Sequence, residues 1–152
     1  MGVELAILHV DDETVIRDVV RRALEAYGFT VVSVDGVRAA KAALTERDDL
    51  AGVLLDIRLR DGNGVDLYEW IAAHRPHLAA RVAFVTGSTD RALLGPLETR
   101  RCPIIEKPFE LAELARFAGE WEDVAHAQDQ YSAPPPQEDR FRDAPPFPAA
   151  GS

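Results

Sequence analysis

The sequence predicts an α/β domain built around a parallel sheet of five strands. Short runs rich in valine, isoleucine and leucine alternate with longer stretches whose apolar residues recur every three or four positions, which is the pattern of repeated βα units. Polar residues follow four of these runs: Asp11 and Asp12, Asp56, Thr86, and Lys107. Because ligands of such sheets bind at the carboxyl ends of the strands, we expect these side chains to converge in one pocket.

The predicted strands are short apolar runs with little polar alternation, as expected for parallel strands buried on both faces. They lie near residues 4–10, 30–34, 51–56, 81–86 and 103–106. Four of them read LAILHV, AGVLL, RVAFV and CPIIE, and each of these four ends at one of the polar positions.

Helices are expected between the strands. The first, from Glu13 to Tyr27, carries two adjacent apolar rows and ends at Gly28. One row is Val15, Val19, Ala23 and Tyr27, and the row alongside it is Ile16, Val20 and Leu24. The second helix is expected over residues 37–46 and the third over residues 65–74, ended by Pro76.

The last two predicted helices differ in how regular their sequence pattern is. Gly95-Pro96 interrupts the fourth, within residues 89–100, so we expect it to be short or broken. The last runs from Glu110 to Trp121 and presents an inward apolar stripe. That stripe consists of Leu111, Leu114, Phe117, Ala118 and Trp121.

Residues 1–122 are predicted to form one domain, and residues 123–152 a proline-rich acidic tail. Six of the ten prolines fall between Pro134 and Pro148, so we expect the tail to be extended or disordered. Two interpretations of the tail stay open: an inert linker, or a docking segment that uses a preorganised polyproline conformation.

The composition limits the kinds of partner and the cellular location that we expect for the chain. A chain of 152 residues with 47% hydrophobic content can bury one ordinary core. Its formal net charge of -9 would repel phosphate backbones, so we expect no direct binding to nucleic acid. The amino terminus shows neither a basic leader nor a long apolar stretch, and the single Cys102 fits a reducing compartment. We therefore expect a cytoplasmic protein without a membrane anchor.

The converging polar residues suggest a specific chemistry. Three carboxylates crowded together cannot all stay ionised cheaply, because each charge raises the proton affinity of its neighbours. Mg²⁺ resolves this, since it prefers oxygen ligands and commonly sits on carboxylates together with a phosphate oxygen. A carboxylate beside the cation can then attack a phosphoryl group. The Lys107 ammonium and the Thr86 hydroxyl would contact the phosphoryl oxygens.

At this point the residues resemble those of the receiver domain of two-component response regulators. The stretches that carry the resemblance are HVDDE with Asp11 and Asp12, LLDIRLRDGNG with Asp56 and Gly64, FVTGS with Thr86, and EKPF with Lys107. The resemblance covers about the first 122 residues and includes the order and spacing of all four motifs. It implies a flavodoxin-like, doubly wound (βα)5 fold with strand order 2-1-3-4-5.

The resemblance also implies roles for individual residues. Asp56 would accept a phosphoryl group from a histidine kinase or a phosphotransfer protein, as a signalling domain and not as an enzyme. The implied Mg²⁺ ligands are Asp11, Asp12, Asp56 and the backbone carbonyl of Arg58. Thr86 and Lys107 would contact the phosphoryl group, and the Lys107–Pro108 peptide bond would be cis.

Some positions depart from the family pattern. Ile104 stands where many members carry an aromatic residue that moves inward with the threonine upon phosphorylation. Gly95-Pro96 disturbs the adjacent helix. We therefore expect Thr86 and residues 88–101 to form a switching element that rearranges differently from the usual one.

Simpler structural roles are available for each residue taken alone. Asp11 and Asp12 could merely cap the first helix, Asp56 could be a turn residue, and Lys107 a solvated surface charge. His9 is expected to be a core histidine with satisfied hydrogen bonds. The joint order of the motifs is what favours a site.

The leading hypothesis is a stand-alone receiver that switches contacts with a downstream protein target and that could dimerise upon phosphorylation. Two alternatives stay open. The first is a small Mg²⁺-dependent phosphotransferase or phosphatase that works through an aspartyl-phosphate. The second is a scaffold module that is never phosphorylated.

Overall fold

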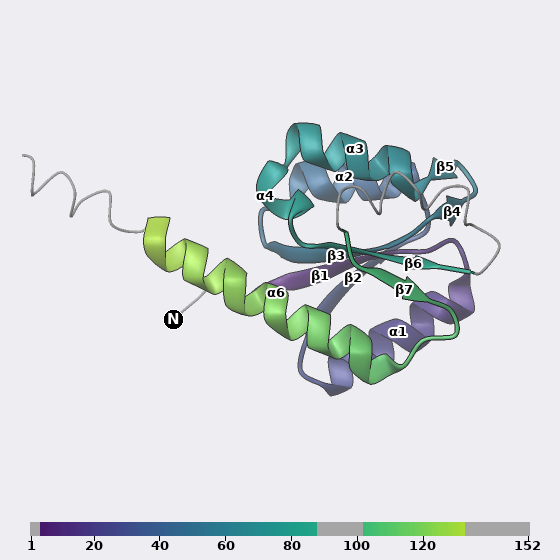
Figure 1. Cartoon of the computed structure of the whole chain (residues 1–152), viewed down its shortest axis with the longest axis horizontal. Helices are drawn as coiled ribbons and strands as arrows, with labels where there is room; N and C mark the ends of the chain where they lie inside the picture. Colours follow the sequence, from purple (N-terminus) through teal and green to yellow (C-terminus); the bar gives the residue numbers. More distant parts are fainter. Residues whose placement is uncertain (1–3, 88–101, 133–152) are drawn as a thin grey trace, which may run out of the picture. The chain divides into compact units, whose positions relative to one another are not determined.

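A computed structural model describes residues 4–87 and 102–132. Its central sheet contains five strands, β1 (Ala6–Val10), β2 (Thr30–Val34), β3 (Leu50–Asp56), β6 (Val82–Thr86) and β7 (Ile104–Glu106). Their order across the sheet is β2-β1-β3-β6-β7, and all neighbours are parallel (Figure 1). Counted along the chain this is the order 2-1-3-4-5, so the predicted doubly wound, flavodoxin-like fold is confirmed.

The register of the strands determines which residues lie side by side at the carboxyl edge of the sheet, which we call the rim. Val10 lies opposite Leu55, and Asp56 lies opposite Val85. Asp11 directly follows Val10, so it continues β1 at the level of Asp56. The hydrogen-bond ladder thus brings two carboxylates to the same rim before any side-chain interaction is considered.

The helices follow the strands as the sequence predicts. They are α1 (Thr14–Ala26), α2 (Val37–Glu46), α3 (Gly64–His74), α4 (Pro76–Ala79) and α6 (Leu111–Ser132). The single turn α4 was not predicted; it begins at Pro76, whose missing N–H costs nothing in the first turn of a helix. The helix predicted within residues 89–100 lies outside the described residues.

Two layers of helices enclose the sheet. In Figure 1, α2 and α3 cover one face, while α1 and the beginning of α6 cover the other. The main core cluster lies between the sheet and the first of these layers, where Leu55 and Phe84 pack with Leu44, Leu67 and Ile71. Residues of β1 and β3 are buried on both faces of the sheet, which explains why these strands read as continuous apolar runs.

The structure buries residues of only one of the two apolar rows of α1. Val20 and Leu24 are fully buried, but Val15 is 72% exposed, Val19 44% and Tyr27 57%. Val20 and Leu24 of the second predicted row thus face the sheet, whereas Val15, Val19 and Tyr27 of the first row do not. A helix on a sheet buries a single stripe, and two adjacent rows of similar apolarity do not reveal which one the sheet will cover.

The end of α6 also differs from the prediction. Leu114, Ala118 and Trp121 are buried as expected, but the helix continues to Ser132. The prediction of an extended segment is thus wrong for residues 123–132, which contain no proline or glycine and include alanine and glutamine, good helix formers. Residues 133–152 lie outside the described part, and the proposed domain limits stay a prediction. Within the described ranges, no helix has the length and hydropathy that a membrane span requires.

Gly52 provides a test of the packing between the sheet and α6. A Cβ at this position of β3 would overlap the indole ring of Trp121 and lie 2.9 Å from the carbonyl oxygen of Arg81. We expect Gly52→Ala to lower the free energy of unfolding by about 1–3 kcal/mol in urea denaturation, because the core has no room for the methyl group.

The double variant Gly52→Ala/Trp121→Leu serves as the control. If the clash with the indole is the cause, the double variant should lose less stability than the sum of the two single losses. Additive losses would contradict this explanation.

Candidate functional site

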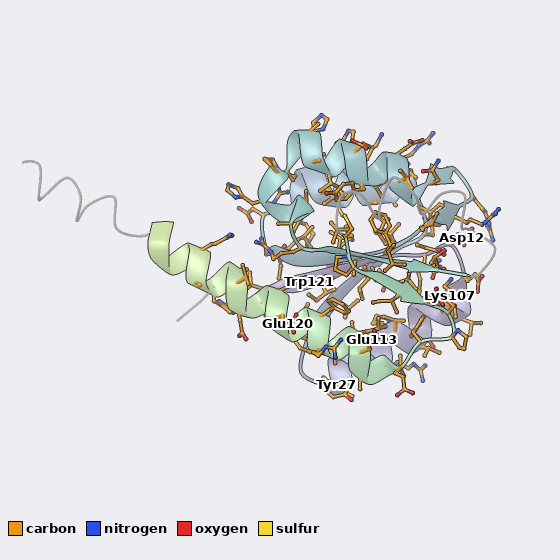
Figure 2. The ribbon with its side chains drawn as sticks, viewed as in Figure 1. Asp12, Tyr27, Lys107, Glu113, Glu120 and Trp121 are labelled. Carbon is orange, nitrogen blue, oxygen red and sulfur yellow. The ribbon has the colours of Figure 1, made fainter. Side chains whose placement is uncertain are left out.

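Three carboxylates gather where β1 and β3 end. Asp11 and Asp12 follow β1, Asp56 is the last residue of β3, and one oxygen of each lies within 4.8 Å of the others. Asp11 and Asp56 are buried, and Asp12 is partly exposed. Figure 2 shows Asp12 and Lys107 at the same end of the sheet. The structure therefore brings the predicted acidic residues together.

Lys107 supplies the positive charge of this cluster. Its backbone N–H donates to the Thr86 carbonyl oxygen at 2.8 Å, which extends the pairing of β6 and β7 by one step. Its Nζ lies 3.3 Å from Oδ2 of Asp56 and 3.6 Å from Oδ2 of Asp11. The Lys107–Pro108 peptide bond is cis, as expected. The ammonium is thus held against the carboxylates and not released to bulk solvent.

Asp11 serves two purposes with its two oxygens. Its Oδ1 accepts the backbone N–H of Glu13 at 2.9 Å, in the turn just before α1, which is close to the capping role of the simpler explanation. Its Oδ2 is buried and accepts no hydrogen bond from the described residues. A cap needs one oxygen, so capping does not account for the second one, which faces Lys107.

Thr86 and Arg58 complete the set of predicted site residues. Thr86 ends β6 fully buried, and its hydroxyl donates to the carbonyl oxygen of Gly87 at 3.1 Å. Arg58 begins a short hairpin of β4 (Arg58–Leu59) and β5 (Gly62–Asn63) that was not predicted. Its backbone N–H donates to the carboxylate of Asp56. The role of the Arg58 carbonyl as a metal ligand stays a prediction.

Burial makes ionisation of the carboxyl groups energetically unfavourable. Removal from water raises the pKa of Asp56 to about 6, and repulsion by Asp11 adds to the effect, against the opposing influence of Lys107. Burial likewise raises the pKa of Asp11, although the N–H of Glu13 and the charge of Lys107 oppose it. A further positive charge nearby would stabilise the ionised form of both carboxylates.

Lys107 cannot supply all of that charge. Burial alone would lower its pKa, but the carboxylates of Asp56 and Asp11 outweigh this and leave the pKa of Lys107 above its ordinary value. The ammonium therefore stays charged at neutral pH. Among the described residues, the ammonium of Lys107 lies against three carboxylates, so this cluster carries a negative excess.

The donor set fits Mg²⁺. The candidate ligands are all oxygens, their spacing allows one ion to reach all three carboxylates, and the buried Oδ2 of Asp11 accepts no hydrogen bond within the described residues. Mg²⁺ favours oxygen ligands of this kind and keeps several waters. Asp11, Asp12 and Asp56 are thus suitable residues to hold it.

The surroundings of His9, which lies beside Asp11, differ from the prediction made from the sequence. It is 2% exposed on β1, its Nε2 lies 3.9 Å from Oδ2 of Asp11, and its Nδ1 has no hydrogen-bond partner among the described residues. The expectation of a satisfied core histidine is therefore wrong. Burial, followed by repulsion from Lys107 and Arg17, lowers the pKa of His9 to about 3, so the ring is neutral. Its spacing of two residues from Asp11, on the same strand face, was the available signal.

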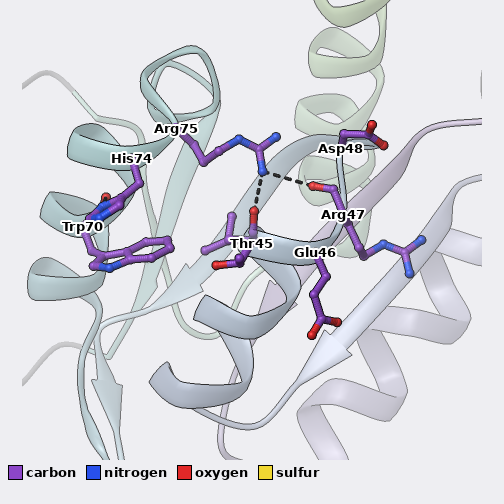
Figure 3. A pocket seen from close by; sticks show the side chains of 8 residues that line it. Thr45, Glu46, Arg47, Asp48, Trp70, His74 and Arg75 are labelled. Atoms are coloured by element: carbon purple, nitrogen blue, oxygen red, sulfur yellow. Dashed lines mark hydrogen bonds between the residues drawn. The ribbon is translucent and has the colours of Figure 1, made fainter.

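A separate pocket of about 540 Å³ lies between the carboxyl-terminal ends of α2 and α3 (Figure 3). Its lining residues are Leu44, Thr45, Glu46, Arg47, Asp48, Trp70, His74 and Arg75. Arg75 donates to the carbonyl oxygens of Leu44 and Arg47 and so ties the two helix ends together. None of the five polar residues at the strand ends lines this pocket.

Comparison with known proteins indicates the family of the chain. A family model described as response regulator receiver domain matches residues 7–118. The transcriptional regulatory protein GltR of Pseudomonas aeruginosa is 33% identical over 111 residues, which are 72% of this chain and 45% of that protein. The photosynthetic apparatus regulatory protein RegA of Rhodobacter capsulatus is 34% identical over 87 residues, 57% of this chain and 46% of that protein. The chain thus spans about half the length of these curated relatives.

Solved structures show the same fold. A response regulator receiver protein from Pseudomonas putida matches with a TM-score of 0.72 and 24% identity, over 79% of this chain and 99% of that one. The receiver domain of NtrX from Brucella abortus matches with a TM-score of 0.67 and 30% identity, over 76% of this chain and 96% of that one. The chain belongs to the response regulator receiver domain family.

Proposed function

We propose that Asp56 is the phosphoryl acceptor of this chain and that a histidine kinase or a histidine phosphotransfer protein is the donor. Receiver domains act in general as phosphoacceptor signalling domains that histidine kinases phosphorylate. The observation that carries the proposal is the position of the Lys107 ammonium, 3.3 Å from a buried carboxylate of Asp56 that lies within a cluster of three acids. A carboxylate in this setting is already paired with a cation.

The transfer follows from the chemistry of the two partners. A carboxylate oxygen of Asp56 attacks phosphorus, and the new O–P bond forms as the P–N bond of the phosphohistidine breaks. The electron pair of that bond stays on the imidazole nitrogen, which takes up a proton. Later attack by water on phosphorus regenerates the carboxylate and releases inorganic phosphate.

The surrounding residues have complementary tasks. Bound at Asp11, Asp12, Asp56 and the Arg58 carbonyl, Mg²⁺ would offset the charge of the carboxylates and of the incoming phosphoryl oxygens. Lys107 pairs with one phosphoryl oxygen, and the Thr86 hydroxyl donates to another. Thr86 ends β6, which pairs with β3, and Lys107 directly follows β7, which pairs with β6; these positions support the proposed contacts.

The output of the domain is a changed protein contact. Phosphorylation adds negative charge and acceptor oxygens at the rim, and we propose that Thr86 and residues 88–101 respond to it and alter binding of a downstream protein. Residues 88–101 lie outside the described part of the chain. The stand-alone organisation, the phosphorylation-dependent dimer, the lack of nucleic-acid binding and the cytoplasmic location stay predictions.

The enzyme alternative receives less support than the receiver. The family model that matches residues 7–118 is that of the response regulator receiver domain. We therefore retain the receiver as the proposed function.

The first prediction concerns the acceptor itself. We expect Asp56→Asn to abolish labelling by a phosphorylated histidine kinase and by acetyl phosphate, because an amide oxygen is a far weaker nucleophile than a carboxylate. Labelling would be followed by radioactive phosphate or by intact-protein mass spectrometry.

Asp48→Asn is the matched control, since Asp48 is exposed and precedes β3 at the opposite end of the sheet. This variant should be labelled like the wild type. Full labelling of Asp56→Asn would exclude Asp56 as the acceptor, and loss of labelling in Asp48→Asn would point to a general folding defect.

The second prediction follows from the pKa of Asp56, which is about 6 in the folded protein against an ordinary value of 3.8. Ionisation therefore costs the folded state more than the unfolded state, and its stability falls as pH rises from about 4 through about 6. Without Mg²⁺ at pH 7.5, Asp56→Asn should be more stable than the wild type by on the order of 1 kcal/mol, a figure reduced for solvent screening at the open rim.

Urea unfolding at pH 4 and pH 7.5 checks this. The advantage of Asp56→Asn should shrink at pH 4, where the wild-type carboxyl is protonated, and saturating Mg²⁺ should stabilise the wild type more than the variant. An equal effect of Asp56→Asn at both pH values would contradict the proposed electrostatic strain.

A further inference from the structure

The hairpin that follows Asp56 is held at its base. The backbone N–H of Gly64 donates to the Ile57 carbonyl oxygen at 2.7 Å, and Arg58 pairs with Asn63 across the two short strands β4 and β5. Arg58, whose carbonyl is the proposed Mg²⁺ ligand, therefore belongs to a closed loop. The position of that carbonyl depends on where the whole hairpin sits.

The tip of the hairpin is tied to α2. Oδ1 of Asp61 accepts the backbone N–H of Val37 at 2.8 Å, and Oδ2 accepts the N–H of Arg38 at 3.0 Å. These N–H groups belong to the first turn of α2, where no helical carbonyl can accept them. The residue before α2, Gly36, offers no side-chain cap, so Asp61 serves as the cap from 24 residues away in sequence.

The two segments approach so closely that a Cβ at position 36 would force the Asp61 side chain to shift. A Cβ on Gly36 would lie 2.5 Å from Oδ1 of Asp61. The backbone of Gly36 is extended, with a φ of -179°, so any residue could adopt its conformation. Glycine is therefore needed for space: it lets the carboxylate of Asp61 reach the start of α2.

Electrostatics reinforce the same contact. The N–H groups of Arg38 and Val37 lower the pKa of Asp61, so the carboxylate is charged at neutral pH. A negative charge at the amino terminus of a helix also interacts favourably with the helix dipole. At neutral pH the contact therefore joins a charged carboxylate to two backbone N–H groups.

The hairpin has two further attachments. The side chain of Leu59 is 8% exposed and packs in the core cluster, and Oδ1 of Asn63 accepts the N–H of Asp66 at 2.9 Å at the start of α3. The loop is therefore suspended between the first turns of α2 and α3. Asp61 supplies the hydrogen bonds that join the tip to α2.

We propose that Asp61 is a positioning residue for the metal site: by anchoring the hairpin on α2, it holds the Arg58 carbonyl where Mg²⁺ can use it. This inference rests on the proposed function, because it assumes that the rim binds Mg²⁺. Asp61 itself does not contact the ion. Without its contact with α2 the loop samples more conformations. Mg²⁺ binding must then order the loop, which makes the free energy of binding less favourable.

The test is a titration of the full chain with MgCl2, followed by the amide signals of Asp12, Asp56 and Arg58 in ¹H–¹⁵N NMR spectra. We expect Asp61→Ala to weaken Mg²⁺ binding about tenfold, the size typical for loss of a group that orients a metal ligand. Gly36→Ala should weaken it in the same direction, because it displaces the Asp61 carboxylate without removing it. The double variant should be no worse than the more affected single variant.

Two matched variants separate positioning from other effects. Asp35→Ala removes an equal charge from the loop before α2 but none of the hydrogen bonds, so it should leave the Mg²⁺ dissociation constant within about twofold of the wild type. Asp61→Asn keeps one acceptor oxygen and should recover part of the lost affinity. Thermal unfolding of each variant without Mg²⁺ reports the loss of the helix cap separately.

The outcomes are distinguishable. If Asp61→Ala lowers the melting temperature but binds Mg²⁺ like the wild type, Asp61 is only a helix cap and the inference is wrong while the proposed function stands. If the wild type itself shows no Mg²⁺-dependent shifts at these amides, both the inference and the proposed function fail. A tenfold loss in Asp61→Ala with little change in Asp35→Ala supports the inference.

Discussion

The structure depends above all on an imbalance of charge at one rim of the sheet. Parallel pairing of β1 and β3 brings Asp11 and Asp56 to the same level, Asp12 adds a third carboxylate, and Lys107 supplies one ammonium. The fold does not relieve this imbalance by exposing the acids, because Asp11 and Asp56 are buried. A site that is strained when empty favours the binding of a divalent cation and, with it, an anionic phosphoryl group.

The rest of the rim is arranged to preserve that geometry. The helices α1, α2 and α3 all begin near it. Asp61 and Asn63 accept N–H groups in the first turns of α2 and α3, and Asp11 accepts the N–H of Glu13 just before α1. Helix amino termini also carry partial positive charge, which favours anions nearby. The loop after Asp56 therefore connects β3 to α3 and also joins the first turns of α2 and α3.

Much of this could be predicted from the sequence, because strands buried on both faces read as continuous apolar runs and site residues follow them directly. That is why the five strands and the convergence of Asp11, Asp12, Asp56 and Lys107 were predictable. Other features depend on tertiary contacts. The exposure of Val15 depends on which apolar row the sheet covers, and the contact of Asp61 with α2 joins segments distant in sequence. The continuation of α6 to Ser132 was predictable from local propensity but was obscured by the proline-rich composition that follows.

The most direct test of the central claim combines Mg²⁺ with beryllofluoride, a mimic of the phosphoryl group, and records the amide signals of Asp56, Thr86 and Lys107. If the carboxylates need a cation before an anion can approach, beryllofluoride alone should leave these signals unchanged, and the two together should shift all three. Shifts with beryllofluoride in the absence of Mg²⁺, or none with both, would contradict the account.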